Sequence, residues 1–251
     1  MKTIFSIRQY LRTAFLGAGL LAAMNAHSTL IAGWDFSGES QLATSTADVS
    51  VNANLDNAPI LTRGIGATAS TGANSFRTQG FQNNGISTAN TDYFQVTFSA
   101  ASGYTLSLST IDARFAGTAT YVASPGVSSQ FAYSLDGTTF ILIGSAVQST
   151  SLTMGQIDLT GISALQNVVD TTTVYFRYYA SGQTATGGWG FNSPAAGQDG
   201  LDFGGTLNAV PGAVPEPGEW GLISALGLLG ICSVSTWRRH HAVRRSALAR
   251  L

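Results

Sequence analysis

The central part of this 251-residue sequence lacks the side chains on which several kinds of catalysis depend. The only cysteine, Cys232, lies outside residues 29–212, and so do the three histidines, His27, His240 and His241. The same central part contains no lysine. These absences exclude a histidine-dependent triad, a cysteine nucleophile, a Schiff-base lysine and a Cys/His zinc site from it. Because a single cysteine cannot form an intramolecular disulfide, core packing must stabilise this part of the chain.

Positive charge is also scarce in the central part. Residues 29–212 contain four arginines against ten aspartates and Glu39, which gives a net charge of −7. Because phosphate binding requires clustered lysine or arginine, we expect no nucleic-acid partner. The arginines are widely spaced, and we expect them to pair with nearby aspartates. They are Arg63, Arg77, Arg114 and Arg177.

Residues 1–28 have the three parts of a secretory signal peptide. A basic segment from Met1 to Arg12 precedes an apolar stretch at residues 14–24. At 1.5 Å per residue, this stretch is too short to span a hydrocarbon core of about 30 Å. Small residues at Ala26 and Ser28 follow it, so we expect cleavage by signal peptidase after Ser28.

The other end of the sequence contains the features of a transmembrane helix. Residues 220–237 carry no charge and would form a helix of roughly 27 Å, with Trp220 and Trp237 at its two ends. A basic tail at residues 238–251 follows, which predicts a cytoplasmic location for the tail under the positive-inside rule. Its basic cluster consists of Arg238, Arg239, Arg244 and Arg245.

Three motifs in this order resemble a known sorting signal. Pro215-Glu216-Pro217, the apolar helix and the arginine cluster together resemble the PEP-CTERM signal of Gram-negative bacteria, over about residues 214–245. The resemblance implies a temporary inner-membrane anchor, processing by an exosortase near Pro215-Glu216-Pro217, and release to the cell surface or extracellular matrix. It also implies exopolysaccharide as a possible partner. Residues 208–219 would then form a proline-rich linker between the central domain and the membrane helix.

The central part is expected to be all-β. It is rich in small polar residues and poor in lysine and glutamate, and Phe94, Val96 and Phe98 alternate with polar residues as in a half-buried strand. Short strands separated by turns predict an antiparallel β-sandwich over residues 29–207, of the jelly-roll type. Further strands are expected at residues 104–111, 129–135, 139–143, 151–159, 172–180 and 201–210.

Three connecting segments complete this prediction. Asp136-Gly137 between two strands indicates a hairpin turn. Residues 159–168 indicate a short helix or turn with Thr160 as its N-cap. Residues 44–73 are rich in small polar side chains and are expected to form a long loop.

Three aspartates are candidate ligands of a structural calcium ion. Asp35 lies on the first expected strand, and Asp199 and Asp202 lie near the last one. If the first and last strands pair, these carboxylates become neighbours, and calcium prefers carboxylate and loop carbonyl oxygens. The alternative is that Asp199 belongs to a turn and Asp35 is a solvated surface residue. No other cofactor is expected.

A tryptophan in a glycine-rich segment is the candidate glycan-binding residue. Gly187, Gly188 and Gly190 surround Trp189, which suggests an exposed loop where the indole could stack on a sugar ring, with Tyr179 and Asn192 nearby. The alternative is that Trp189 packs over the end of the sandwich core.

These features favour an exported, non-enzymatic protein of the extracellular matrix, with a structural or weak glycan-binding sandwich and no catalytic residues. The alternative is a secreted glycan hydrolase that uses an Asp/Glu pair. Carboxylates are the only general acid/base groups in the central part, but no motif identifies a pair.

Overall fold

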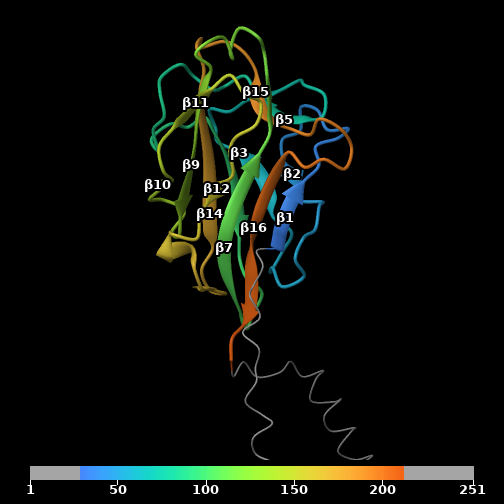
Figure 1. Ribbon diagram of the computed structural model, residues 1–251, viewed down its shortest axis with the longest axis vertical. Coiled ribbons are helices and arrows are strands. Elements are labelled where there is room, and N and C mark those ends of the chain that lie inside the picture. The colour runs from blue at the N-terminus through green and yellow to red at the C-terminus, as the bar shows by residue number, and fades with distance from the viewer. Residues whose placement is uncertain (1–28, 212–251) are drawn as a thin grey trace, which may run out of the picture.

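The computed structural model describes residues 29–211, and this part of the chain is all-β (Figure 1). Its strands form three antiparallel sheets, in an arrangement consistent with a β-sandwich. The one helical element in the described range is a short 3₁₀ helix at Ser163–Leu165. The predicted all-β class and antiparallel pairing are therefore confirmed.

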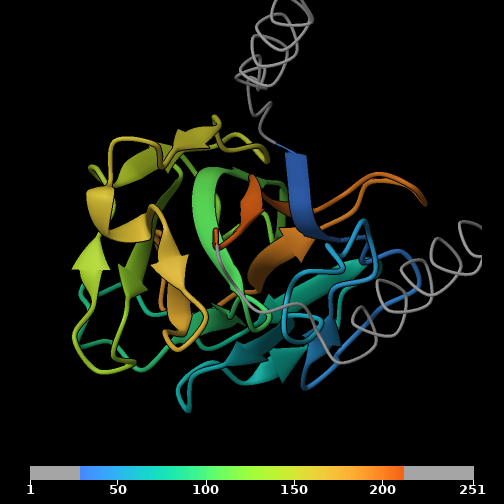
Figure 2. The same ribbon diagram turned by 90° about the horizontal axis from the view of Figure 1, so that it is seen from below.

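The first sheet has five strands and contains both ends of the described chain. Its order is β1-β16-β7-β12, and β13 also pairs with β7. The bounds are β1 (Thr29–Trp34), β7 (Tyr104–Ala113), β12 (Ile157–Asp158), β13 (Val168–Val169) and β16 (Leu201–Ala209). Seen from below, β1 lies beside β16, with β7 on the other side of β16 (Figure 2). The first and last strands therefore pair, as the calcium prediction required.

The second sheet has seven strands in the order β10-β9-β14-β6-β3-β2, with β11 also paired to β9. The bounds are β2 (Ser45–Thr46), β3 (Ile60–Arg63), β6 (Tyr93–Phe98), β9 (Val127–Ser134), β10 (Ile141–Leu142), β11 (Val147–Ser149) and β14 (Val174–Ser181). A smaller sheet has the order β4-β5-β15-β8. Its bounds are β4 (Ala69–Ser70), β5 (Ser75–Thr78), β8 (Phe115–Gly117) and β15 (Trp189–Asn192).

Aromatic side chains join the two larger sheets in a common core. Phe203 on β16 lies 4.8 Å from Phe98 on β6 and 5.1 Å from Phe176 on β14, measured between ring centroids. All three are at most 1% exposed. The alternation read from the sequence of β6 is also confirmed, because Phe94, Val96 and Phe98 are buried while the residues between them are half-buried. Full burial of each such side chain contributes about 1.5–3 kcal/mol to stability.

The turn between β9 and β10 has the predicted chemistry. Gly137 has a φ of 72°, which is in the left-handed region that favours glycine. Oδ1 of Asp136 accepts hydrogen bonds from the backbone N–H groups of Thr138 and Thr139, at 2.8 and 2.7 Å. These bonds lower the pKa of Asp136. The hairpin prediction is confirmed, with β10 pairing antiparallel to β9.

Several boundaries differ from the predictions. The 3₁₀ helix begins after Ile162, which makes no side-chain capping bond, so the predicted N-cap at Thr160 is wrong. The hydroxyl of Thr160 instead donates to Asp158. Residues 44–73 are not one long loop, because they contain β2, β3 and β4, which take their stability from pairing with other strands.

One further difference concerns a strand. Of the strand expected at residues 151–159, only β12 is formed, together with an isolated bridge between Arg114 and Thr153. The strand expected at 201–210 is confirmed as β16, which ends at Ala209, opposite Tyr104 at the start of β7.

The predicted export and anchoring segments lie outside the described residues. These are the signal peptide at 1–28, the sorting motif Pro215-Glu216-Pro217, the membrane helix at 220–237 and the basic tail at 238–251. Within residues 29–211, no helix has the length and apolar character needed to cross a membrane.

Candidate functional site

Of the two placements considered for Trp189, the structure supports packing in the core and contradicts an exposed sugar-stacking position. Trp189 lies on β15 between β5 and β8 and is 1% exposed. Its Nε1 donates a hydrogen bond of 2.7 Å to the hydroxyl of Tyr178, and its ring stacks on Phe115 at 5.0 Å. A Cβ at Gly190 would lie 2.1 Å from the backbone oxygen of Phe76, so this glycine permits close packing of β15 against β5. The glycines therefore indicate close strand packing in place of the expected exposed loop.

The other two candidate glycan-binding residues are also engaged in the fold. Tyr179 is fully buried on β14, where its ring contacts Tyr93 edge to face, and it belongs to a different cluster from Trp189. Asn192 is half-buried at the end of β15, and its Nδ2 donates to the backbone oxygen of Asn74 at 2.7 Å. The structure does not bring Trp189, Tyr179 and Asn192 together as a binding site.

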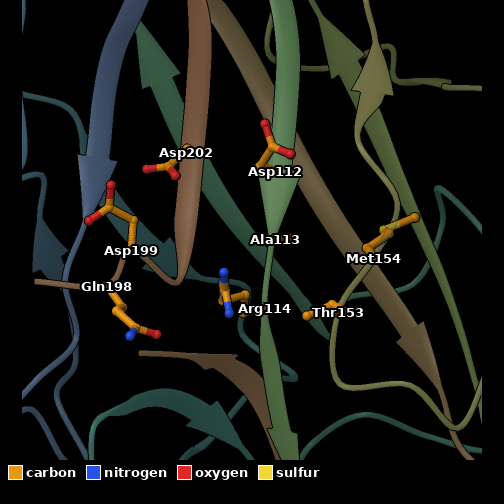
Figure 3. Close-up of a pocket in the computed structure, with 8 residues that line it drawn as sticks. All are labelled: Asp112, Ala113, Arg114, Thr153, Met154, Gln198, Asp199 and Asp202. Carbon is orange, nitrogen blue, oxygen red and sulfur yellow. The ribbon is translucent and has the colours of Figure 1, made fainter. Parts of the chain in front are cut away.

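A polar pocket of about 420 Å³ lies elsewhere, where β7 ends and β16 begins (Figure 3). Figure 3 shows Asp199 and Asp202 close together beside β16, with Asp112 projecting from β7 and Gln198 and Arg114 below them. The pocket is lined by Asp112, Ala113, Arg114, Thr153, Met154, Gln198, Asp199 and Asp202. We call this set the acidic pocket.

Strand register places the carboxylates of the acidic pocket. Asp202 pairs with Gly33 on β1 and with Asp112 on β7, so these three residues form one row across the sheet. Leu201 and Phe203 on either side of Asp202 are buried in the core, which directs Asp202 to the outer face of the sheet. Ile111 and Ala113 flank Asp112 in the same way.

Backbone contacts between separate segments position the rest of the pocket. Arg114 follows β7, and its N–H donates to the carbonyl of Gly200 at 2.9 Å. The N–H of Met154 donates to the carbonyl of Ala113 at 3.0 Å. Residues distant in sequence are therefore held around one hollow by main-chain bonds.

A glycine permits the close approach of Asp202 to β1. A Cβ on Gly33 would lie 2.3 Å from Oδ1 of Asp202, a distance that real Cβ atoms essentially never show. The same Oδ1 is shielded from solvent and accepts no hydrogen bond from residues 29–211. The carboxyl of Asp202 therefore fills the space over the glycine that a side chain would otherwise occupy.

The environment of Asp202 favours its protonated form. Burial and the neighbouring charge of Asp199 raise the pKa of Asp202 to about 7. Burial also raises the pKa of Asp199, while a hydrogen bond from Asp202 and the positive charge of Arg114 oppose this effect. Because a neighbouring carboxylate disfavours ionisation, Asp202 keeps its proton to a higher pH than a free aspartate does.

Most of the arginines do not pair with aspartates as expected. Arg63 donates to backbone oxygens that include that of Arg77, at 2.9 Å. Arg77 donates to the backbone oxygen of Gly188 at 3.2 Å, and Arg177 to Oε1 of Gln95 at 2.8 Å. Arg114 is the arginine that lies among carboxylates, because it lines the acidic pocket.

The structure brings the three candidate calcium ligands to one edge of the molecule. Asp35 follows β1, and its Oδ2 accepts a hydrogen bond of 2.6 Å from the N–H of Gly197, close to Asp199. This bond and one from Ser37 lower the pKa of Asp35. However, residues 29–211 contain no group of three or more His, Cys, Asp or Glu side chains that could hold a metal ion. Calcium binding by Asp35, Asp199 and Asp202 therefore stays a prediction.

Sequence reasoning identified Asp199 and Asp202 but missed Asp112, Arg114, Thr153 and Met154 as pocket residues. Strict alternation from Leu106 and Leu108 would have placed Asp112 on the inner face. A register shift between Gly204 and Gly205 in the pairing of β16 with β7 interrupts this alternation, so Asp112 lies on the outer face instead. No local pattern shows that Asp112 lies opposite Asp202, because strand pairing joins residues far apart in the sequence.

No protein-family model matches this chain, and no curated protein matches it.

Proposed function

We propose that the chain is an exported, non-enzymatic protein of the cell surface or extracellular matrix, and that its sandwich binds a polysaccharide in the acidic pocket. The pocket is the observation on which the binding role depends. It is of a size suited to small ligands, and its carboxylates, Gln198, Thr153 and Arg114 offer both donors and acceptors for sugar hydroxyl groups. A jelly-roll arrangement of the strands also forms part of the proposal.

The export route in this proposal depends on the two ends of the sequence. The signal-peptide pattern at 1–28 supports secretion. The similarity of residues 214–245 to PEP-CTERM signals supports transient anchoring in the inner membrane and release by an exosortase. Polysaccharide-producing bacteria are the setting that this similarity implies, which agrees with a matrix ligand.

A glycan hydrolase is the second candidate, because Asp112 lies opposite an aspartate that holds a proton near neutral pH. Glycosidases use such a pair, with one carboxyl as acid and the other as nucleophile or base. However, no motif in the sequence identifies an acid/base pair, so binding without hydrolysis is the function that we favour.

The test is a pull-down of exopolysaccharide with the mature protein, alongside an assay for new reducing ends. We expect retention of polysaccharide without cleavage, and weaker retention by Asp112→Asn. Asp56→Asn is the matched control, because Asp56 is exposed and lies outside the pocket. Cleavage that disappears in Asp112→Asn would favour the hydrolase, and absence of any binding would leave a purely structural role.

A further inference from the structure

The seven-stranded sheet ends on one side in a free edge, formed by β10 and β11 (Figure 1). Within residues 29–211, both strands pair with β9 alone, so no strand lies against their outer N–H and C=O groups. The segment that joins them is also open to solvent, because residues 144–148 are all exposed. An edge of this kind is a template for pairing with a strand of another chain. We call residues 141–149 the free edge.

Apolar side chains gather at the free edge. Ile141 is 53% exposed, Leu142 37% and Val147 45%. Ile141 and Val147 lie on the same face of the sheet. Their partners on β9, Tyr133 and Ser129, are an even number of positions apart, and side chains two positions apart on a strand share a face. Pairing of a second strand with the free edge would remove part of this apolar surface from water, which favours association.

The free edge also lacks the residues that usually keep exposed edges apart. Residues 137–157 contain no charged residue and no proline, although natural sheets commonly protect an edge with one or the other. The remaining edges of the two larger sheets each have a carboxylate close in sequence. Asp35 follows β1, Asp48 follows β2, Asp158 lies on β12 and Asp170 follows β13. The free edge is therefore the exception among them.

A second copy of the chain is the partner that fits the free edge. Residues 29–212 contain four arginines against eleven acidic residues, so two copies repel each other where their carboxylates meet. In a two-fold symmetric dimer the same surface of each copy meets itself. The free edges of two copies can meet without bringing carboxylates together, unlike the other edges. We propose that the chain forms a two-fold symmetric dimer in which the free edges of two copies pair as antiparallel strands.

The length of the free edge limits the strength of this dimer. At about 3.4 Å per residue, residues 141–149 extend over at most roughly 30 Å. An interface built on so short an edge belongs to the small, reversible class. The inference does not depend on the proposed polysaccharide binding, because none of residues 141–149 lines the acidic pocket.

The experiment measures the mass of the purified mature protein by sedimentation velocity and light scattering over a range of concentrations. We expect mainly monomer at about 1 μM and mainly dimer at about 100 μM, as for a small reversible interface. Ile141→Lys and Val147→Lys should each weaken dimerisation at least about tenfold, because each places a charge on an edge that meets its own copy. Ile65→Lys is the matched control, because Ile65 is 95% exposed and lies outside the free edge.

Hydrogen exchange of the unsubstituted protein locates the interface without relying on a variant. The backbone amides of residues 141–149 should exchange more slowly at about 100 μM than at about 1 μM, because pairing engages them in hydrogen bonds. The amides of β2, at the opposite edge of the same sheet, should exchange at the same rate at both concentrations.

Several outcomes would overturn the inference. A protein that remains monomeric at about 100 μM would show that the free edge does not pair at the expected strength. A dimer that Ile65→Lys weakens equally, or one without slower exchange at residues 141–149, would have its interface elsewhere. If the protein is monomeric throughout and Ile141→Lys abolishes retention of exopolysaccharide, the free edge belongs to a glycan site. Failure to bind exopolysaccharide would overturn the proposed function and leave the dimer unaffected.

Discussion

The surroundings of the Asp202 carboxyl group disfavour its ionisation. It lies next to Asp199, opposite Asp112, and over Gly33, and its pKa is raised to about 7. Aspartate in an unfolded chain titrates near pH 3.9. Between these two values the folded protein holds a proton that the unfolded chain releases. The stability that Asp202 contributes is therefore complete below about pH 4 and is lost as the pH rises through about 7.

Replacing Asp202 by asparagine should stabilise the protein above neutral pH. The amide cannot ionise, so Asp202→Asn should raise the free energy of unfolding at pH 8 by about 1–2 kcal/mol, after allowance for solvent screening. At pH 4 the difference should be small. Urea unfolding at both pH values measures this, with Asp56→Asn as the control. A loss of stability at pH 8 would mean that the charge of Asp202 supports the native fold.

Trp189 illustrates a residue whose role follows from its burial. Its indole packs in the core beside Phe115. Its Nε1 donates a hydrogen bond to the hydroxyl of Tyr178, which is itself buried. Removing the indole would create a cavity and would remove one hydrogen-bond partner of that hydroxyl.

Trp189→Ala should therefore cost about 3–5 kcal/mol of stability, and Trp189→Phe should cost less. Urea unfolding gives the size of both effects. Binding of polysaccharide per folded molecule should not change, because Trp189 does not line the acidic pocket. A Trp189→Ala protein with full stability and no binding would show that the sugar-stacking role was correct after all.

At the scale of elements, the pairing of β1 with β16 determines where the acidic pocket forms. Gly33 lies opposite Asp202, and the N–H of Gly200 donates to the carbonyl of Trp34 at 2.9 Å. The same pairing brings Asp35 close to Gly197 and Asp199. A substitution at Gly33 should therefore affect both the pairing of the edge strand β1 and the position of Asp202 in the acidic pocket.

Gly33→Ala should destabilise the protein by about 1–3 kcal/mol, because the new Cβ would collide with the carboxyl of Asp202. Asp202→Ala removes that carboxyl, so the double variant should be more stable than the sum of the two single effects predicts. A double-mutant cycle in urea unfolding measures this coupling. Strict additivity would show that Gly33 is required for its backbone conformation and not for the contact.

The parts of the fold that could be predicted are those determined by local patterns. Alternation of Phe94, Val96 and Phe98 identified β6, and Asp136-Gly137 identified the β9–β10 turn. Two-residue strands such as β2 and β4 were missed, because their stability comes from pairing and not from their own sequence.

The candidate site could be predicted only in part, for the same reason. Asp199 and Asp202 were found because the first and last strands were expected to pair. Asp112 and Arg114 depend on the register of β7 against β16, which no local pattern contains. The placement of Trp189 stayed open between an exposed loop and the core, because its glycine neighbours are compatible with either flexibility or close packing. The structure shows close packing, with Gly190 against the backbone of Phe76.

At the scale of the whole molecule, the acidic pocket and the start of the C-terminal segment lie at opposite ends of β16. Asp202 is near the beginning of this strand, and Ala209 is its last residue, next to Tyr104 (Figure 1). Seven steps of about 3.4 Å separate them, a distance of roughly 24 Å. The proposed C-terminal anchor would therefore join the described residues at the end of β16 that lies away from the pocket.

This arrangement predicts that anchoring and polysaccharide binding are independent. In a host with an exosortase, replacing Pro215-Glu216-Pro217 by alanines should leave the full-length protein in the membrane fraction, because the proposed processing signal is lost. Pro211→Ala, outside the motif, should be released normally. Immunoblots of membrane and released fractions measure this difference.

The retained variant should still bind exopolysaccharide on cells whose outer layers have been removed, with the affinity of the released protein to within about twofold. Its pocket is formed by residues that precede the anchor and lie away from it. Release of the alanine variant at the normal level would contradict the sorting proposal. Retention with loss of binding would mean that the anchored protein presents its pocket toward the membrane, so that processing would then serve to expose it.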